Sequence, residues 1–143
     1  MIRHPKKRGE WVELRFMARA AAHGLSVAKP WGDSAYYDFI VEHGGVFRRV
    51  QVKSSMAMIG NQYIASCHPP TRPKQGYTEA EIDFLAVFII PVDVWYVIPA
   101  SALRGRKFGI ALNPWRPRSK YTRYLEAWHL LTGDGGVKKS SRR

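Results

Sequence analysis

The sequence predicts a single α/β domain in which a mixed central β-sheet is flanked by helices, with one helix at each end of the chain. Its length of 143 residues suits one domain. Apolar residues recur at helical spacing in a segment near each terminus. Between these segments lie short runs of β-branched and aromatic residues, separated by Gly and Pro, and such runs are typical of strands.

The N-terminal segment predicts a helix over residues 9–24. Apolar side chains recur at intervals of three and four residues from Trp11 to Leu25, as on one face of a helix. Gly24 is the expected C-terminal stop, because glycine readily adopts the left-handed conformation that ends helices. A short strand is expected next, over residues 26–29.

A β-hairpin is the strongest local signal in the chain. Residues 36–43 and 46–54 both have strand character, and Gly44-Gly45 alone separates them. Two consecutive glycines favour a type I′ turn, which needs positive φ at both positions. We therefore expect two antiparallel strands joined by a two-residue loop.

The second half of the chain predicts further strands and a closing helix. A capping-box pattern at residues 78–81 indicates the start of a short helix. The closing helix is expected over residues 119–131 and ends at Gly133. The expected strands are a weaker one at 63–67, two apolar central ones at 84–90 and 94–98, and an edge strand at 108–112.

Positive charge is concentrated in three zones. The chain has 23 Lys and Arg against 11 Asp and Glu, a net charge of +12. We predict a basic N-terminal arm (1–8), a domain (9–132) and a basic disordered tail (133–143). The third zone is the acid-free stretch 104–123. Such zones favour a polyanion partner, because phosphate neutralisation dominates nucleic-acid affinity. Solubilising charge is the alternative.

Several protein classes are excluded by simple features of the sequence. The longest apolar run covers residues 84–92 and is too short to span a bilayer. The N-terminus lacks the apolar stretch of a signal peptide. Cys67 is the single cysteine, which rules out an internal disulfide framework. We expect a cytoplasmic protein without a membrane partner.

The hairpin register brings three polar side chains together. With Gly44-Gly45 as the whole loop, Asp38 lies opposite Gln51, and Lys53 shares their face of the sheet. The other face then offers apolar residues such as Tyr37 to the core. Glu13 on the first helix is bordered by apolar neighbours, which is unusual for an acid without a partner.

Structural roles remain open for each of these residues. Glu13 could complement the dipole of its helix N-terminus. Asp38 could pair with Arg49 or Lys53, and the segment that contains Gln51 could be a solvent-facing edge strand. Taken together, however, the four polar residues favour a site of chemistry.

In this order the motifs resemble the PD-(D/E)XK nuclease superfamily: a helix Glu13, a strand Asp38, then Gln51-x-Lys53 on the following strand. Gln in place of the usual acid, after the pattern Pro30-x-Gly-Asp-x-x-x-Tyr-Asp38, is similar to the branch that contains a cyanobacterial group I intron homing endonuclease. The resemblance covers residues 8–55 well and residues 78–102 loosely. It implies a restriction-endonuclease-like core.

The resemblance also implies a metal-dependent phosphodiester hydrolase with Mg²⁺ as cofactor and Mn²⁺ as a substitute. Asp38 would be the central metal ligand, and the Gln51 side-chain oxygen, the Val52 carbonyl and Glu13 would complete the set. Lys53 would orient the attacking water and stabilise developing charge. Gln51 removes one negative charge from the common pattern, which places two-metal occupancy in doubt.

DNA is the expected substrate, and the basic zones are its expected contacts. A double-strand cutter needs two active sites, so we expect a homodimer or homotetramer. Trp115 and Tyr121, set among basic residues, are candidates for stacking. The predicted DNA-binding residues are Lys6, Lys7, Arg8, Arg104, Arg106, Lys107, Arg116, Arg118, Lys120 and Arg123.

Three functions compete at this point. The leading hypothesis is a DNA endonuclease of the homing, junction-resolving or restriction and repair type. A catalytically inactive DNA-binding protein on a nuclease fold is the first rival, although an inactive copy usually loses the lysine or the aspartate. A basic RNA-binding protein is the second, and it leaves the clustered acids unexplained.

Overall fold

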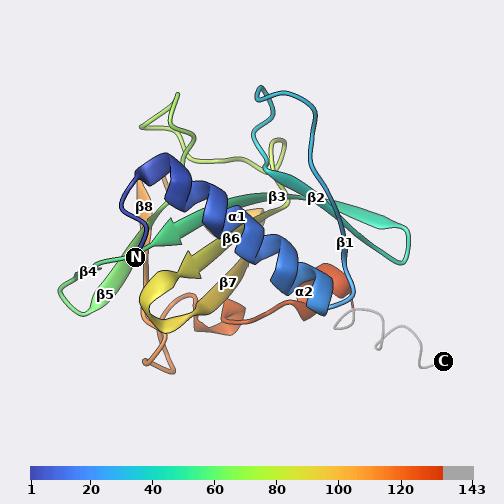
Figure 1. Cartoon of the computed structure of the whole chain (residues 1–143). Helices are drawn as coiled ribbons and strands as arrows, with labels where there is room; N and C mark the ends of the chain where they lie inside the picture. Colours follow the sequence, from blue (N-terminus) through green and yellow to red (C-terminus); the bar gives the residue numbers. More distant parts are fainter. Residues whose placement is uncertain (134–143) are drawn as a thin grey trace.

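Two β-sheets and one long helix make up the structure, a computed structural model that describes residues 1–133 (Figure 1). The predicted α/β class with a mixed sheet is confirmed. The predicted tail, apart from Gly133, lies outside the described residues. The helices are α1 (Pro5–Ala22) and α2 (His129–Thr132), and the 3-10 turns are η1 (Ile90–Val92), η2 (Ala100–Leu103) and η3 (Thr122–Tyr124).

The main sheet has five strands in the order β1-β2-β3-β6-β7. β3 and β6 are parallel, and the other neighbours are antiparallel. The smaller sheet has the order β4-β5-β8. The strands are β1 (Ser26–Ala28), β2 (Phe39–His43), β3 (Val46–Ser55), β4 (Met58–Ile59), β5 (Gln62–Ser66), β6 (Phe84–Ile89), β7 (Val94–Pro99) and β8 (Gly109–Leu112).

The main sheet is buried on both faces, and β6 shows this most clearly. Its side chains alternate between two cores: Phe84 and Phe88 pack toward α1, whereas Leu85 and Val87 pack toward the smaller sheet. All six residues of β6 are buried, as its continuous apolar pattern predicts. β6 is therefore central as predicted, but β7 is the last strand of the sheet and not a central one.

Helix α1 begins four residues earlier than predicted. Pro5 is its first residue, and the His4 side chain accepts a hydrogen bond from the backbone N–H of Lys7 (3.4 Å). Proline suits this position because the first helical N–H has no partner within the helix. Half of the predicted basic arm is thus helical, and it continues the helix that crosses the sheet in Figure 1.

The predicted closing helix over residues 119–131 is wrong. The segment forms only η3 and the four-residue α2, because Glu126 adopts a positive φ of 51° that interrupts the helix. Its N–H donates to the Trp95 carbonyl (2.7 Å), and Leu125 forms a β-bridge with Tyr96. The segment therefore covers the edge of β7, the last strand of the main sheet. Gly133, with φ 75°, ends α2 as predicted.

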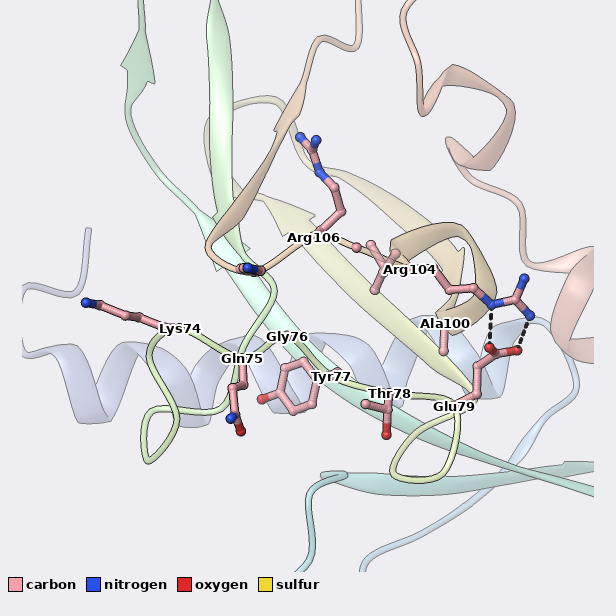
Figure 2. Close-up of a pocket in the computed structure, with 12 residues that line it drawn as sticks. Lys74, Gln75, Gly76, Tyr77, Thr78, Glu79, Ala100, Arg104 and Arg106 are labelled. Carbon is pink, nitrogen blue, oxygen red and sulfur yellow. Dashed lines mark hydrogen bonds and ion pairs between the residues drawn. The ribbon is translucent and has the colours of Figure 1, made fainter.

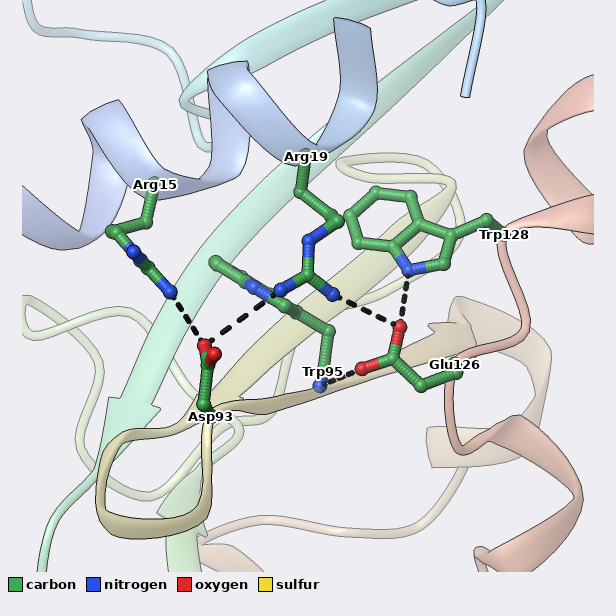
Figure 3. Close-up of polar contacts among 6 residues, drawn as sticks. All are labelled: Arg15, Arg19, Asp93, Trp95, Glu126 and Trp128. Carbon is green, nitrogen blue, oxygen red and sulfur yellow. Dashed lines mark hydrogen bonds and ion pairs between the residues drawn. The ribbon is translucent and has the colours of Figure 1, made fainter. Parts of the chain in front are cut away.

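A cluster of charged side chains fastens this segment to α1 (Figure 3). The Glu126 carboxylate accepts hydrogen bonds from the Trp95 N–H and the Trp128 indole N–H, both at 2.8 Å. Arg19 bridges Glu126 (3.3 Å) and Asp93 (3.7 Å). We call these residues, with the Arg15 that also pairs with Asp93, the Glu126 cluster.

Three smaller findings concern a loop, an edge strand and hydropathy. The capping-box contact at residues 78–81 exists, since the Thr78 N–H donates to the Glu81 carboxylate (3.0 Å), but it closes a turn and the predicted short helix is absent. The expected edge strand at the end of the domain is confirmed as β8, which borders the smaller sheet. Within residues 1–133, no helix combines the length and apolar character that a bilayer span requires.

Candidate active site

The β2–β3 hairpin has the predicted register. His43 pairs with Val46, and Gly44 and Gly45 have φ of 59° and 82°, as a type I′ turn requires. Asp38 stands just before β2, and its N–H donates to the Val50 carbonyl (2.9 Å). Because Phe39 is the residue paired with Val50, the regular ladder ends at Phe39, and the predicted pairing of Asp38 with Gln51 is not part of it. Because β3 also pairs with β6, it is an inner strand, and the edge-strand alternative is wrong.

One apolar residue of the hairpin is placed differently from the expectation. Phe39, Val41 and Val50 point into the core beneath α1, as predicted. Tyr37, expected beside them, packs instead against the core on the other side of the sheet. The regular alternation of side chains therefore begins at Phe39, where β2 begins.

Asp38 is half-buried and its carboxylate turns toward the next strand, where it accepts a hydrogen bond from the Val52 N–H (2.9 Å). Burial raises the pKa of Asp38, and the negative charge of Glu13 raises it further. The Val52 hydrogen bond and the positive charges of Lys29 and Lys53 only partly oppose this. The protein therefore holds an acid whose ionisation it does not fully compensate.

Lys53 lies on β3 and is also half-buried. Its Nζ donates to the His68 carbonyl (3.4 Å) and lies 5.5 Å from the centre of the Tyr77 ring. Burial lowers the pKa of Lys53, although the nearby Asp38 carboxylate acts in the opposite direction. Within the described residues Asp38 forms a salt bridge with neither Lys53 nor Arg49, and Arg49 binds Asp83 instead.

Glu13 projects from α1 toward this hairpin and pairs with Lys29 (2.9 Å). The Lys29 Nζ in turn lies 4.4 Å from the centre of the Phe39 ring. Because α1 begins at Pro5, Glu13 is two turns inside the helix, beyond the first turn where the dipole acts on an acid. The helix-dipole interpretation of Glu13 is therefore wrong.

Gln51, the fourth predicted site residue, contacts its neighbour Val52. Its side-chain Nε2 donates to the Val52 carbonyl (3.3 Å), the backbone oxygen expected to bind metal. Val52 thus contacts both candidate residues, Gln51 through its carbonyl and Asp38 through its N–H. Within residues 1–133, no three His, Cys, Asp or Glu side chains gather at a metal-binding spacing.

Lys29 and Tyr77 are the two neighbours of the site that sequence reasoning missed. Lys29 follows β1, whose pairing with β2 places Ala28 opposite Ile40 and so brings Lys29 toward Glu13. The short strand was visible in the sequence, but its partner was not. Tyr77 comes from a distant irregular loop, and no local pattern marks it.

The predicted basic residues divide among three places: the first turns of α1, a groove and the segment after β8. Arg106 and Lys107 border a groove together with Lys74 (Figure 2), whereas Arg104, in the same groove, forms a bidentate pair with Glu79 (2.7 and 3.0 Å). The loop after β8 lies at the bottom of Figure 1, and the loop that leads to Asp38 lies at the top. The exposed basic residues of the segment between β8 and α2 are Arg116, Arg118, Lys120 and Arg123.

The two candidate stacking residues differ in exposure. Trp115 is exposed and packs loosely against Tyr63, with ring centres 5.8 Å apart. Tyr121 is buried, so its proposed stacking on a base is wrong. The first turns of α1 carry the remaining basic residues, Lys6 and Lys7, both exposed, and Arg8, which donates to the Ile2 carbonyl (3.2 Å).

Comparisons with known proteins agree with this geometry. No curated protein sequence matches the chain. Among solved structures, a bacterial homing endonuclease, I-Ssp6803I, superposes with a TM-score of 0.77 at 26% sequence identity, over 97% of this chain and 99% of that one. The sequence model of PD-(D/E)XK endonucleases matches residues 3–131. The chain therefore belongs to the PD-(D/E)XK endonuclease family.

Proposed function

We propose that the chain is a divalent-metal-dependent DNA endonuclease of the homing type, with Glu13, Asp38, Gln51 and Lys53 as its active site. One observation carries the proposal. Asp38 and Lys53 stand on one hairpin, both half-buried, with pKa values moved toward each other and no direct ion pair within the described residues. Such unrelieved charges are costly, and they cluster at functional sites.

The oxygen donors suit Mg²⁺ or Mn²⁺. Two carboxylates, an amide oxygen and a backbone carbonyl are hard ligands, and Mg²⁺ keeps several waters beside few carboxylates. Asp38 and the Val52 carbonyl would hold the ion, with Glu13 bound directly or through water and Gln51 bound after its amide turns its oxygen inward. A bound ion supplies positive charge for the phosphate and lowers the pKa of bound water.

Lys53 would act on the water and the phosphate. Its ammonium is held by the His68 carbonyl and the Tyr77 ring, so it reaches the substrate with little reorganisation. Lys29 keeps Glu13 from repelling the phosphate, since their ion pair neutralises that acid in the free protein.

The surface around this centre suits duplex DNA. The loop that leads to Asp38 exposes Trp31 completely (100%), which gives a base or sugar an aromatic face to contact. Lys6 and Lys7 on α1 and the groove bordered by Lys74 supply positive charge. Cutting both strands needs two copies of the site, so we propose a homodimer or homotetramer.

The homing type is favoured over junction-resolving and restriction or repair types by the structural neighbour. That protein is described as a homing endonuclease, and the match extends over nearly all of both chains. The inactive DNA-binding protein remains the second candidate. The retention of Asp38 and Lys53 in an energetically unfavourable setting argues against it, because a protein that only binds DNA gains nothing from either.

Cleavage of plasmid and of four-way junctions with defined metals tests the proposal. We expect nicking and double-strand cutting with Mg²⁺ or Mn²⁺, and none with Ca²⁺ or EDTA. Full activity in EDTA would refute metal dependence. Cleavage of junctions in preference to linear duplex would replace the homing type with the resolving type, and binding without cleavage under every metal would favour the inactive protein.

Gln51→Glu examines the unusual member of the site. If Gln51 is a metal ligand, the added carboxylate strengthens metal binding, and the metal concentration for half-maximal cleavage falls. If Gln51 contacts DNA instead, the new charge repels phosphate and weakens DNA binding. Isothermal titration with Mn²⁺ and a DNA-binding assay in Ca²⁺ separate the two results.

A further inference from the structure

Tyr77 stands between the candidate active site and the basic groove. It follows the irregular loop 68–76, and its N–H donates to the Cys67 carbonyl (3.0 Å), which anchors the residue beside the end of β5. Its side chain is buried in the core shared with the smaller sheet. The residue also lines the groove, and Figure 2 shows its ring projecting between Gln75 and Thr78.

Gly76 fixes this position through a close approach of two backbones. A Cβ added at Gly76 would lie 2.0 Å from the Arg106 carbonyl oxygen, so only glycine allows the two walls of the groove to meet there. The backbone of Tyr77 is therefore held by two contacts: its own N–H bonds to Cys67, and its neighbour Gly76 packs against Arg106.

The ring of Tyr77 lies against the Lys53 ammonium, with 5.5 Å between Nζ and the ring centre. A cation over an aromatic face is attracted by the ring quadrupole. The same loop supplies the His68 carbonyl that accepts from Lys53 (3.4 Å). Two contacts from one loop thus fix the lysine without using the Tyr77 hydroxyl.

The Tyr77 hydroxyl itself has no protein acceptor within the described residues. The hydroxyls of Tyr96 and Tyr121 also lack partners there and are enclosed in the protein, whereas Tyr77 lines the groove and keeps an exposed fraction of 6%. Burial raises the pKa of Tyr77 well above its usual value, and the Asp38 carboxylate raises it further. The hydroxyl is therefore a protonated, accessible donor next to the catalytic acid and lysine.

We propose that Tyr77 is a further catalytic residue whose hydroxyl donates a hydrogen bond to a non-bridging oxygen of the scissile phosphate. In hydrolysis, water adds to phosphorus, the bond to the leaving oxygen breaks, and that oxygen takes up a proton. Negative charge grows on the non-bridging oxygens as the water adds, and a donor placed in advance stabilises it. The inference rests on the proposed nuclease function.

The groove explains why a phosphate would pass this hydroxyl. It has a volume of about 330 Å³, and Lys74, Arg106 and Lys107 give it an excess of positive charge. Its one acid, Glu79, is neutralised by Arg104. Tyr77 both lines this groove and lies against Lys53, so a strand that runs from a phosphate at Lys53 into the groove would pass beside Tyr77.

Tyr77→Phe is the test, with Tyr96→Phe as the matched control. Both variants lose an unpartnered hydroxyl and keep the ring, but only Tyr77 lies near Asp38. In single-turnover cleavage at saturating protein with Mg²⁺, we expect Tyr77→Phe to slow the reaction by about 10²-fold, the effect of losing one such donor. DNA affinity in Ca²⁺ and the melting temperature stay close to wild type, and Tyr96→Phe cuts at the wild-type rate.

A phosphorothioate at the scissile position distinguishes direct contact from an indirect effect. Sulfur accepts hydrogen bonds poorly, so one of the two sulfur isomers should slow wild type and have a much smaller effect on Tyr77→Phe. Equal sulfur effects in both proteins would overturn the contact, as would wild-type rates in Tyr77→Phe. If wild type cuts no DNA at all, the nuclease function and this inference fail together.

Discussion

Helix α1 faces two groups of acids, and the protein treats them in opposite ways. Toward the Glu126 cluster it presents Arg15 and Arg19, and each acid there has an arginine partner. Toward the hairpin it presents Glu13, a second acid, and the pKa of Asp38 rises. Arginine-paired acids mark the place where the fold is fastened, whereas Asp38, which has no ion pair among the described residues, marks the place where chemistry is proposed.

The largest expected effect is on the cleavage rate, in variants of the two candidate catalytic residues at the hairpin. Asp38→Asn and Lys53→Ala should each reduce cleavage by at least about 10³-fold, because one removes a metal-binding charge and the other a donor to water and phosphate. Asp93→Asn is the matched control, since it makes the same change in the Glu126 cluster. Single-turnover rates measure the effect, and wild-type rates in both hairpin variants would show that the site lies elsewhere.

Glu126→Gln should affect stability and leave chemistry intact. The carboxylate accepts from the Trp95 N–H with one oxygen and from the Trp128 indole with the other. Glutamine places an NH₂ against one of these donors, and leaving such a donor unsatisfied costs about 1–3 kcal/mol. Urea unfolding measures the loss. An unchanged unfolding free energy, or a lost cleavage step below the melting temperature, would contradict the assignment.

The smallest expected effect concerns Asp83 and Asp38, whose negative charges contribute to stability with opposite signs. Burial would raise the pKa of Asp83, but hydrogen bonds from the Arg49 side chain and backbone outweigh it and lower the pKa. Asp83 therefore stabilises the fold above its unfolded pKa, and this stability is lost as the pH falls through the folded value. Asp38, with a raised pKa, destabilises the fold once ionised.

At neutral pH, Asp38→Asn should thus raise the unfolding free energy by up to about 1 kcal/mol, whereas Asp83→Asn should lower it. The gain from Asp38→Asn shrinks as the pH falls through the raised pKa, because wild type then protonates the same group. Denaturant unfolding at several pH values measures both. Destabilisation by Asp38→Asn at neutral pH would show that Asp38 is a structural acid.

Local signals explain what the sequence could predict. Gly44-Gly45 set the hairpin register, which is as predicted from Phe39–Val50 to His43–Val46. That register brings the segment that contains Asp38 beside the strand that carries Gln51 and Lys53. The apolar pattern of β6 predicted a strand buried on both sides. These features depend on residues close together in the chain, where backbone geometry and alternation decide the outcome.

Long-range contacts explain the rest. Residues 119–131 have helical periodicity, but Glu126 bonds to Trp95, 31 residues away, and this pairing overrides helix propensity. Lys29 and Tyr77 join the site only through the pairing of β1 with β2 and the approach of loop 68–76. No periodic pattern encodes such contacts, so Lys29 and Tyr77 escaped prediction, whereas the candidate residues on the hairpin follow from local signals.

The contact between Glu126 and β7 also bears on solubility. β7 ends the main sheet, and its run of Val, Trp, Tyr and Ile is uncharged and rich in residues that favour cross-β stacking. An open edge of this kind can template the addition of strands from other molecules. Glu126 occupies both the N–H and the carbonyl of Trp95 on that edge. The turn at Glu126 thus protects the edge of β7 from the addition of strands from other molecules.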